Sequence, residues 1–308
     1  MKGFLVPLLL VAAFPGVLSA VEPTAVADGL AMYRIGQGEP VLLMPYPHAS
    51  GRVSMAESRL AAVLIGMGRS VITFDPPGAY RSTREPQIDT AEMLGCGIET
   101  LDFFGVAHGI DGVTRGIDIV GHSMSGFCAL AFSIEHPSRV RTLVLIGSTS
   151  GWPAIKKWGI QKQLGQDRRA YRRLMWHGFW LFAGLGNLAD HKKLDHIIDQ
   201  ASFVDTSYVE EIEISRDDNR RPPPVRAAWP GYLRRSNADY RDRLDELQLP
   251  VLLCVGRHDP QTPPVMSREL HDGINGSELV VFESSGHAPF VEQEAEFVCV
   301  LREFLSRP

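Results

Sequence analysis

The sequence predicts an α/β fold, a mostly parallel β-sheet flanked by helices, with an inserted helical cap. Short apolar runs alternate with helix-like segments, and such runs are typical of parallel strands buried on both faces. Between residues 151 and 247 the strand-like runs disappear, which indicates a separate inserted unit. A length of 308 residues suits one large α/β domain with such an insertion.

Six apolar runs are expected to form the strands of the sheet. They cover residues 41–44, 70–74, 117–120, 141–146, 251–255 and 279–282. Helices are expected directly after the third run, at 127–134, and after the last run, at 292–305. The core is therefore predicted to comprise residues 21–150 and 248–308, and the helical cap residues 151–247.

The predicted cap is rich in basic and aromatic side chains. It holds the chain's five tryptophans, Trp152, Trp158, Trp176, Trp180 and Trp229, and the arginines Arg168, Arg169, Arg172 and Arg173 at helical spacing. We expect a basic, solvated outer face and an aromatic inner face. The aromatic side chains would form either the core of the cap or a lid over a pocket.

The first 20 residues differ from the rest of the chain. Met1-Lys2-Gly3 precedes an apolar run from residue 4 to residue 14, and small residues lead to Ala20. This pattern is typical of a secretory signal peptide, so residues 1–20 are predicted to be removed and the protein to be secreted or periplasmic. The alternatives are an uncleaved membrane anchor and a cytoplasmic protein with a misassigned start codon. No stable membrane insertion is expected after signal cleavage.

Composition narrows the choice of partners. A formal net charge of −5 argues against a general nucleic-acid binder. No metal-ligand spacing, phosphate loop or dinucleotide motif is present, so a small-molecule substrate and no cofactor are expected. The four cysteines are Cys96, Cys128, Cys254 and Cys299, and the last three lie in apolar runs. Such cysteines are usually small buried hydrophobic residues with free thiols.

Ser123 is the candidate nucleophile. It follows the strand 117–120 and precedes the helix 127–134 in a G-x-S-x-S pattern, with Gly121 two residues before it and Ser125 two residues after it. A sharp turn between a strand and a helix needs small flanking residues and raises the serine hydroxyl above the sheet.

A serine hydroxyl needs a general base, and the base needs a carboxylate that orients it. His287 follows the last predicted strand, and Asp259 follows the strand 251–255. We therefore predict the triad Ser123, Asp259 and His287, in this order along the chain. His122 is expected to pack beside the turn, because its side chain would leave it in another direction. Asp75 is the competing acid, and closing the Pro-Pro-Gly turn beside it is its expected role.

An oxyanion hole is also required. One donor is expected to be the N–H of Met124, the residue after the nucleophile. The second should come from the loop after the first predicted strand, where Pro45 and Pro47 carry no N–H. This leaves Tyr46 as the predicted second donor.

These segments resemble the α/β-hydrolase superfamily over essentially everything after residue 25. The order serine, acid, histidine is the one found in that superfamily. The motifs around Asp259 and His287 are most similar to the branch with proline iminopeptidases and small esterases. Two positions depart from the family pattern: Met44-Pro45-Tyr46-Pro47 replaces the usual His-Gly-x-x, and Ser125 replaces a glycine.

The leading functional hypothesis is hydrolysis of an ester or amide bond of a small substrate through an acyl-serine intermediate, with carboxylic esters favoured. One alternative is an aminopeptidase similar to proline iminopeptidases, in which Glu210, Glu211 and Glu213 would hold the substrate's amino terminus. For these three residues we favour a solvated acidic helix over that role. Another is hydrolysis of a carbon–carbon bond by the same triad. A ligand-binding, receptor-like protein on the same fold is the non-enzymatic alternative. A dehalogenase would need an aspartate at the position of Ser123. The sequence does not indicate an oligomeric state.

Overall fold

The computed structural model describes residues 21–47, 54–87, 89–106, 116–159, 169, 172, 173, 176, 196–209 and 239–307. The predicted signal peptide at 1–20 lies outside these residues and stays a prediction, and the same holds for much of the predicted cap. In the described part of the chain, no helix is both long enough and apolar enough to cross a membrane.

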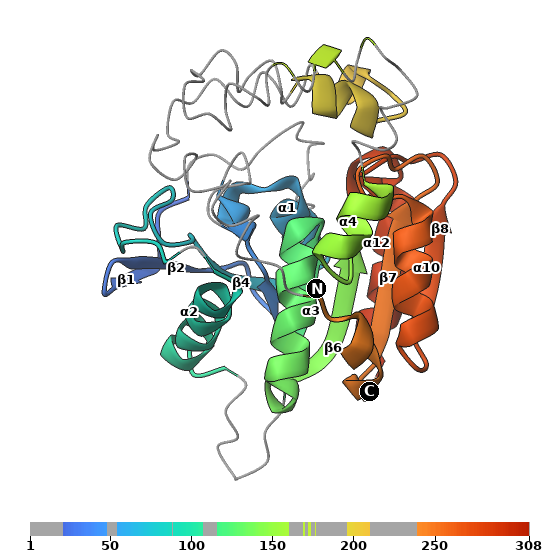
Figure 1. Ribbon diagram of the computed structural model, residues 1–308. Coiled ribbons are helices and arrows are strands. Elements are labelled where there is room, and N and C mark those ends of the chain that lie inside the picture. Colours follow the sequence, from blue (N-terminus) through green and yellow to red (C-terminus); the bar gives the residue numbers. More distant parts are fainter. Residues whose placement is uncertain are drawn as a thin grey trace, which may run out of the picture.

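One eight-stranded sheet, in the order β1-β2-β4-β3-β5-β6-β7-β8, forms the centre of the described structure (Figure 1). The strands are β1 (Ala25–Ala27), β2 (Leu30–Ile35), β3 (Pro40–Leu43), β4 (Ser70–Phe74), β5 (Ile117–His122), β6 (Val140–Ile146), β7 (Val251–Gly256) and β8 (Glu278–Phe282). Strands β3 to β8 run parallel, whereas β1 and β2 pair antiparallel at one edge. The predicted parallel strands are confirmed, while β1 and β2 were not predicted.

Helices cover both faces of the sheet. They are α1 (Arg59–Gly66), α2 (Thr90–Phe103), α3 (Met124–Glu135), α4 (Trp152–Trp158), α10 (Pro264–Gly273), α11 (Pro289–Glu292) and α12 (Glu294–Leu305). Helices α2, α3 and α10 share one core cluster with the sheet, and α1 and α12 share the other. Among the described residues, short 3₁₀ helices at Met55–Glu57, Pro137–Arg139 and Arg241–Glu246 lie in the connections.

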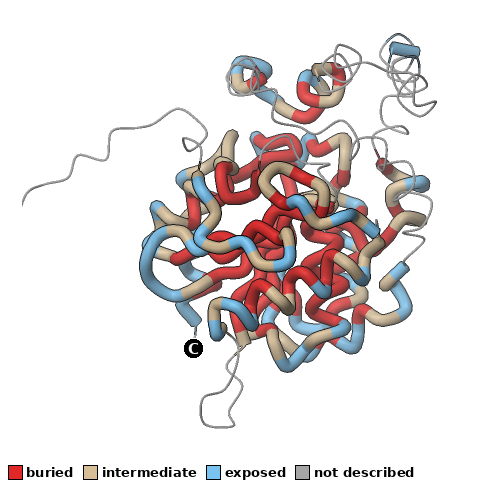
Figure 2. Tube along the Cα trace, turned by 90° about the vertical axis from the view of Figure 1, so that its left-hand side faces the viewer, coloured by how far each residue is buried: buried red, intermediate tan, exposed pale blue. Residues whose placement is uncertain are grey.

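Alternation along the strands explains the two cores. In β3, Leu42 packs with the α2 and α3 side, whereas Val41 and Leu43 pack with α1 and α12. All three side chains are fully buried, which explains why the sequence of this strand is a continuous apolar run. Figure 2 shows the same result for the whole described chain, with buried residues running through the middle of the molecule. The strands packed between these two clusters carry the candidate site at their ends.

The C-terminal helix differs from its prediction. A single helix was expected over 292–305, but the backbone breaks at Gln293, where φ is −128° and ψ is 47°. The Gln293 side chain accepts a hydrogen bond from the N–H of Ser284 at 2.8 Å. Helix α11 therefore ends at Glu292 and a second helix, α12, begins at Glu294.

The predicted insertion leaves the sheet after β6 and returns before β7, two strands that pair directly. Gly151, at its start, forms an antiparallel bridge with Asp239, eight residues before its predicted end, and the N–H of Tyr240 donates to the carbonyl of Ser150 at 3.0 Å. Within it, residues 196–202 are helical, and Figure 1 shows residues 196–209, in yellow, beyond one end of the sheet.

Two expectations about side chains are wrong. Trp176 is 61% exposed rather than part of an aromatic inner face. Cys299 lies exposed on α12, whereas Cys128 and Cys254 are buried as expected. All four cysteines are free thiols.

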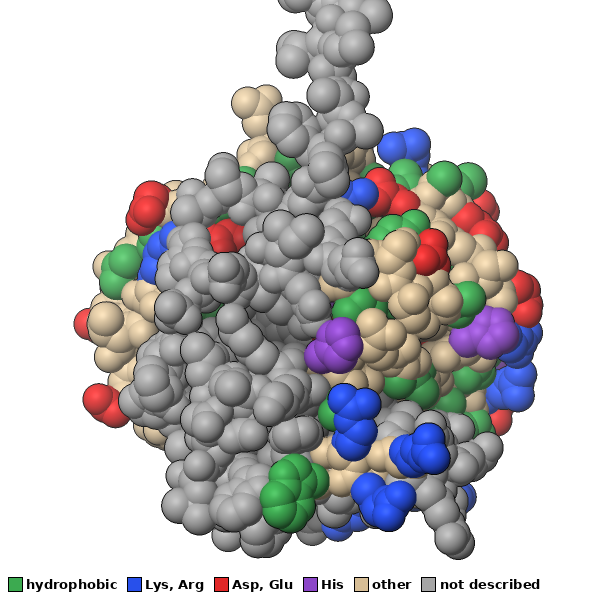
Figure 3. All heavy atoms as spheres, turned by 90° about the horizontal axis from the view of Figure 1, so that it is seen from above, with side chains coloured by type: hydrophobic (Ala, Val, Ile, Leu, Met, Phe, Trp, Pro, Cys, Tyr) green, Lys and Arg blue, Asp and Glu red, His purple; other side chains and the backbone are tan. Residues whose placement is uncertain are grey.

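The basic face of the cap agrees with its prediction where the structure describes it. Arg169, Arg172 and Arg173 are helical and exposed. Figure 3, seen from the cap side, shows a group of Lys and Arg side chains on this surface. These arginines therefore belong to a solvated helix face.

Candidate active site

Ser123 lies on a sharp turn between β5 and α3. Its backbone has φ 56° and ψ −124°, a region that costs a residue other than glycine about 1–3 kcal/mol. Two hydrogen bonds fix the turn: the N–H of Ser123 donates to the carbonyl of Ile146 at 2.8 Å, and the hydroxyl of Ser148 donates to the carbonyl of Ser123 at 3.1 Å. The predicted turn is present, and these hydrogen bonds hold the Ser123 backbone in its strained conformation.

Close packing explains the small residues around the turn. A Cβ atom on Gly121 would lie 2.6 Å from the Cα of Gly126, and one on Gly126 would lie 2.5 Å from the hydroxyl oxygen of Ser148. Ser125 is fully buried, and its hydroxyl donates to the carbonyl of His122 and accepts from its N–H, both at 2.8 Å. The serine that departs from the family pattern thus closes the turn.

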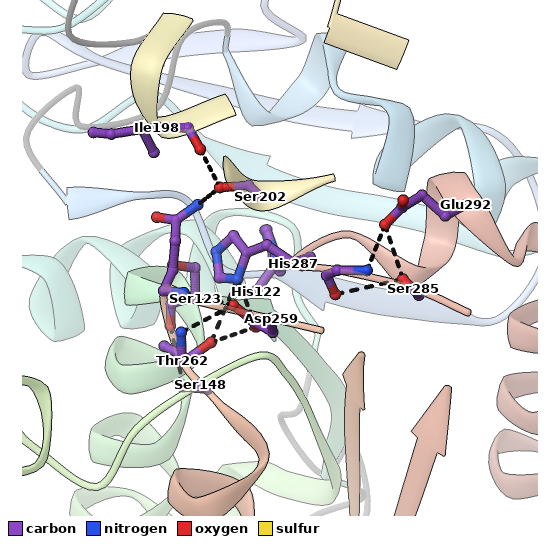
Figure 4. Close-up of polar contacts among 12 residues, drawn as sticks. His122, Ser123, Ser148, Ile198, Ser202, Asp259, Thr262, Ser285, His287 and Glu292 are labelled. Atoms are coloured by element: carbon purple, nitrogen blue, oxygen red, sulfur yellow. Dashed lines mark hydrogen bonds and ion pairs between the residues drawn. The ribbon is translucent and has the colours of Figure 1, made fainter. Parts of the chain in front are cut away.

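Asp259 and His287 form a buried pair. The loop after β7 carries Asp259 and the loop after β8 carries His287, and 2.8 Å separates the aspartate Oδ2 from the histidine Nδ1 (Figure 4). The aspartate accepts three further hydrogen bonds, from the N–H of Gln261 at 2.8 Å and from the N–H and hydroxyl of Thr262 at 3.0 and 2.8 Å. Thr262 was not predicted, although an aspartate that accepts from N–H groups two and three residues onward is a common turn pattern.

These contacts set the charge of Asp259. Burial by itself raises the pKa of a carboxyl group, but His287 and the hydrogen bonds from His287 and Thr262 together lower the pKa of Asp259. The group is therefore an ionised carboxylate at neutral pH. A carboxylate accepts a proton donor, so the Nδ1 of His287 carries hydrogen and its Nε2 is the basic atom.

Gly147 connects this pair to Ser123. It follows Ile146, the residue that holds the Ser123 N–H, and a Cβ at Gly147 would lie 3.0 Å from the Asp259 Oδ2 and 3.3 Å from the His287 Nδ1. The structure thus brings the three predicted residues to one edge of the sheet. Among the described residues, the Ser123 hydroxyl makes no hydrogen bond to His287. Such contacts often tighten only when substrate binds.

His122 packs beside the turn, as expected, and links two loops. Its Nε2 lies 2.8 Å from the carbonyl oxygen of His287, the two rings are 4.5 Å apart, and its Nδ1 contacts the hydroxyl of Tyr46. Burial and the neighbouring His287 lower the pKa of His122 to about 3. The ring is therefore neutral: Nε2 donates to the carbonyl, and Nδ1 accepts from Tyr46.

The low pKa of His122 predicts acid sensitivity. Its folded pKa of about 3 lies below the ordinary value of 6.5, so protonation between these values favours the unfolded chain and stability falls as the pH falls. We expect the wild type to lose about 3 kcal/mol more unfolding free energy between pH 7 and pH 4 than His122→Gln. Urea unfolding of both proteins at the two pH values measures this. Equal losses would show that His122 does not contribute.

The competing acid, Asp75, belongs to a different network. It is buried and accepts hydrogen bonds from the hydroxyls of Ser54 and Tyr33, at 2.5 and 2.6 Å, and from the N–H of Arg81 at 3.0 Å. Burial raises the pKa of Asp75. These contacts close the loop after β4, which is the role expected for it.

The two predicted oxyanion donors flank the same strand. Met124 is the first residue of α3, and the first N–H groups of a helix have no carbonyl partner within the helix. Tyr46 follows β3, and the N–H of Met44 donates to the carbonyl of Val120 at 2.9 Å, which keeps this loop beside β5. The rest of the loop, residues 48–53, lies outside the described residues.

A narrow, mostly apolar crevice, too tight to hold a water molecule, lies beside the turn. Its lining comes from α3, α4 and the segment between them: Met124, Phe127, Thr149, Gly151, Trp152 and Ile155. In the described part of the chain, no group of three His, Cys, Asp or Glu side chains could hold a metal ion.

Known proteins resemble this chain in sequence. The sequence matches the family described as alpha/beta hydrolase fold over residues 54–294. A pimeloyl-[acyl-carrier protein] methyl ester esterase of Neisseria meningitidis is 28% identical over 66% of this chain and 75% of its own length. A 2-hydroxy-6-oxononadienedioate/2-hydroxy-6-oxononatrienedioate hydrolase of Cupriavidus pinatubonensis is 26% identical over 91% of this chain and 93% of its own length.

Solved structures share the fold. An alpha/beta fold family hydrolase from Bacillus anthracis superposes with a TM-score of 0.71 at 17% identity, covering 94% of this chain and 99% of the other. A meta-cleavage product hydrolase from Pseudomonas fluorescens gives a TM-score of 0.65 at 18% identity, covering 90% and 93%. At such identities the likeness extends to the fold alone.

Proposed function

Because this chain is a hydrolase of the α/β-hydrolase fold family, we propose that it cleaves an ester or amide bond of a small substrate through an acyl-Ser123 intermediate, with carboxylic esters favoured. The observation that carries the proposal is the buried Asp259–His287 pair, 2.8 Å apart, beside a serine on a strained turn. This arrangement has the parts that serine hydrolysis needs: a nucleophile, a base and a group that orients the base.

The proposed reaction has two halves. The Nε2 of His287 takes the Ser123 proton while the serine oxygen attacks the substrate carbonyl, and the N–H groups of Met124 and Tyr46 stabilise the resulting oxyanion. His287 then gives the proton to the leaving group, and the acyl-serine remains. In the second half His287 activates water, which releases the acid and restores Ser123. The carboxylate of Asp259 stabilises the imidazolium in both halves.

A second candidate is hydrolysis of a carbon–carbon bond. The relatives that match most of this chain include hydrolases of 2-hydroxy-6-oxo dienoates. Such compounds contain a ketone rather than an ester or amide, so water can divide them only at a carbon–carbon bond. We favour the ester because the Neisseria esterase is 28% identical to this chain, against 26% and 27% for these two hydrolases. The same three residues would serve either reaction.

Two further alternatives depend on other parts of the chain. The acidic residues that an aminopeptidase would use, Glu210, Glu211 and Glu213, lie outside the described residues. A receptor-like protein would bind its ligand without turnover. It would gain nothing from a serine held in a strained backbone beside a basic histidine, so hydrolysis accounts better for the geometry.

The test is a substrate panel combined with active-site labelling. Purified protein is assayed with p-nitrophenyl esters of increasing acyl length, with prolyl and other aminoacyl amides, and with a 2-hydroxy-6-oxo dienoate. We expect turnover of one or more esters and covalent labelling by a fluorophosphonate probe. Turnover of the dienoate alone would establish the second candidate. Failure of labelling and of all substrates would favour the receptor-like alternative.

A further inference from the structure

One segment of the predicted cap contacts the loop of the proposed base directly. The carbonyl oxygen of Ser202 accepts a hydrogen bond from the backbone N–H of His287 at 2.7 Å. The contact is close, because a Cβ atom on Gly286 would lie only 2.0 Å from that oxygen. The backbone of the cap thus packs against the residue immediately before His287.

Glu292, the last residue of α11, joins the same two segments. Its Oε2 accepts from the N–H of Gly286 at 2.6 Å and from the hydroxyl of Ser285 at 3.1 Å. Its Oε1 accepts from the N–H groups of Val204 and Asp205 at 2.7 and 3.3 Å. One carboxylate therefore bonds the base loop through one oxygen and the cap through the other. Figure 4 shows Glu292 and Ser285 next to the His287 loop.

The cap is also tied to the loop of Asp259. The side-chain amide of Gln261 donates to the Ser202 hydroxyl at 2.8 Å, while the backbone N–H of Gln261 donates to the Asp259 carboxylate at 2.8 Å. The Ser202 hydroxyl in turn donates to the carbonyl of Ile198, which fixes it to its own helix at 2.5 Å. The loop of Asp259 and the loop of His287 are thus both hydrogen-bonded to Ser202.

We propose that Glu292 is a positioning residue: its carboxylate fixes cap residues 204–205 against the loop of His287, so that the base is held in place only while this cap segment is docked. The proposal rests on the proposed function of His287 as the general base. In this proposal, cap residues 204–205 help to position His287 and do not merely cover the active site.

The contacts require a carboxylate. All four donors point at the two oxygens of Glu292, and an amide offers only one oxygen as an acceptor. In Glu292→Gln the NH₂ group must face either the N–H of Gly286 or the N–H of Val204. Two donors then oppose each other, and one of the two segments is released.

The test compares Glu292→Gln with Glu303→Gln, a change of the same kind on α12, where the Glu303 side chain is 75% exposed. Hydrogen exchange of the whole chain is measured at the amides of Val204, Asp205 and Gly286, together with the rate of fluorophosphonate labelling and the kinetics on a p-nitrophenyl ester. We expect Glu292→Gln to speed exchange in both segments and to lower kcat and the labelling rate by about 10- to 100-fold, with little change in KM. Glu303→Gln should match the wild type.

A second variant guards against a simple folding failure. Gly286→Ala places a methyl group where the carbonyl of Ser202 lies and should displace the cap segment from the other side, with the same loss of kcat. Faster exchange at 204–205 with unchanged kcat in Glu292→Gln would overturn the proposal, and so would a rise in KM alone. If the wild type itself is neither labelled nor active, the proposed function fails, while the exchange comparison still shows whether Glu292 couples the two segments.

Discussion

Ser123→Ala is expected to lower kcat by about 10⁶-fold on any ester that the wild type turns over, and to abolish fluorophosphonate labelling. In the proposed mechanism the hydroxyl is the atom that attacks, and alanine removes it. Alanine has the same size at Cβ and keeps the backbone hydrogen bond to Ile146, so the turn should persist. Active-site labelling and initial rates measure the loss, and circular dichroism checks the fold.

A matched control comes from the helix that follows the turn. Ser133 is fully buried in α3, and its hydroxyl donates only to the carbonyl of Ala129 at 2.8 Å. Ser133→Ala should lose some stability and keep its kcat. Turnover of Ser123→Ala near the wild-type rate would exclude an acyl-serine mechanism, whatever the control does.

Asp259→Asn should lower kcat by about 10⁴-fold with the fold intact. The Oδ1 of Asp259 accepts from the N–H groups of Gln261 and Thr262, so the amide oxygen of asparagine will occupy that position. The NH₂ group then replaces Oδ2 and faces the Nδ1 of His287. A donor there forces hydrogen onto Nε2, and the base loses the lone pair it needs. Steady-state kinetics on a p-nitrophenyl ester measure the loss.

Asp75→Asn provides the comparison for that result. Asp75 is equally buried, but its partners are Ser54, Tyr33 and Arg81 rather than His287. Its amide variant should lower the melting temperature and leave kcat within about threefold of the wild type, because the loop after β4 supplies no catalytic group. If Asp75→Asn caused the larger kinetic loss, the assignment of the acid to Asp259 would be wrong.

The sequence predicts some elements of the fold much better than others. A strand buried on both faces, such as β5, reads as an apolar run, so the parallel strands could be located closely. β1 has only three residues and pairs at the sheet edge, where no run of apolar residues is needed. The break at Gln293 is not apparent from the apolar periodicity, and the Gln293 side chain accepts from the N–H of Ser284, nine residues earlier in the chain.

In the candidate site, too, some residues could be predicted from the sequence and others could not. Ser123, Asp259 and His287 could be predicted because each follows a strand of a parallel sheet, and such strands end at one edge. Ser202 and Glu292 could not be assigned a role, because the contacts of Ser202 with His287 and of Glu292 with Val204 join segments 85 and 88 residues apart in the chain. Periodicity describes a segment's own structure and says nothing about which carbonyl another segment will meet.

The bridge between Gly151 and Asp239 has a consequence for how this enzyme could change its substrate. Chain-closure entropy grows slowly with length, about 0.6 kcal/mol for each doubling, so a loop with both ends pinned at adjacent strands can lengthen or shrink at little thermodynamic cost. The segment between Gly151 and Asp239 could therefore be replaced by another, in evolution or by design, without a change in the order of the strands. If the proposed role of Glu292 holds, the replacement must retain three backbone groups: the carbonyl of Ser202 and the N–H groups of Val204 and Asp205. Substrate specificity could then change with the exchanged residues, while activity would depend on the backbone groups at residues 202–205.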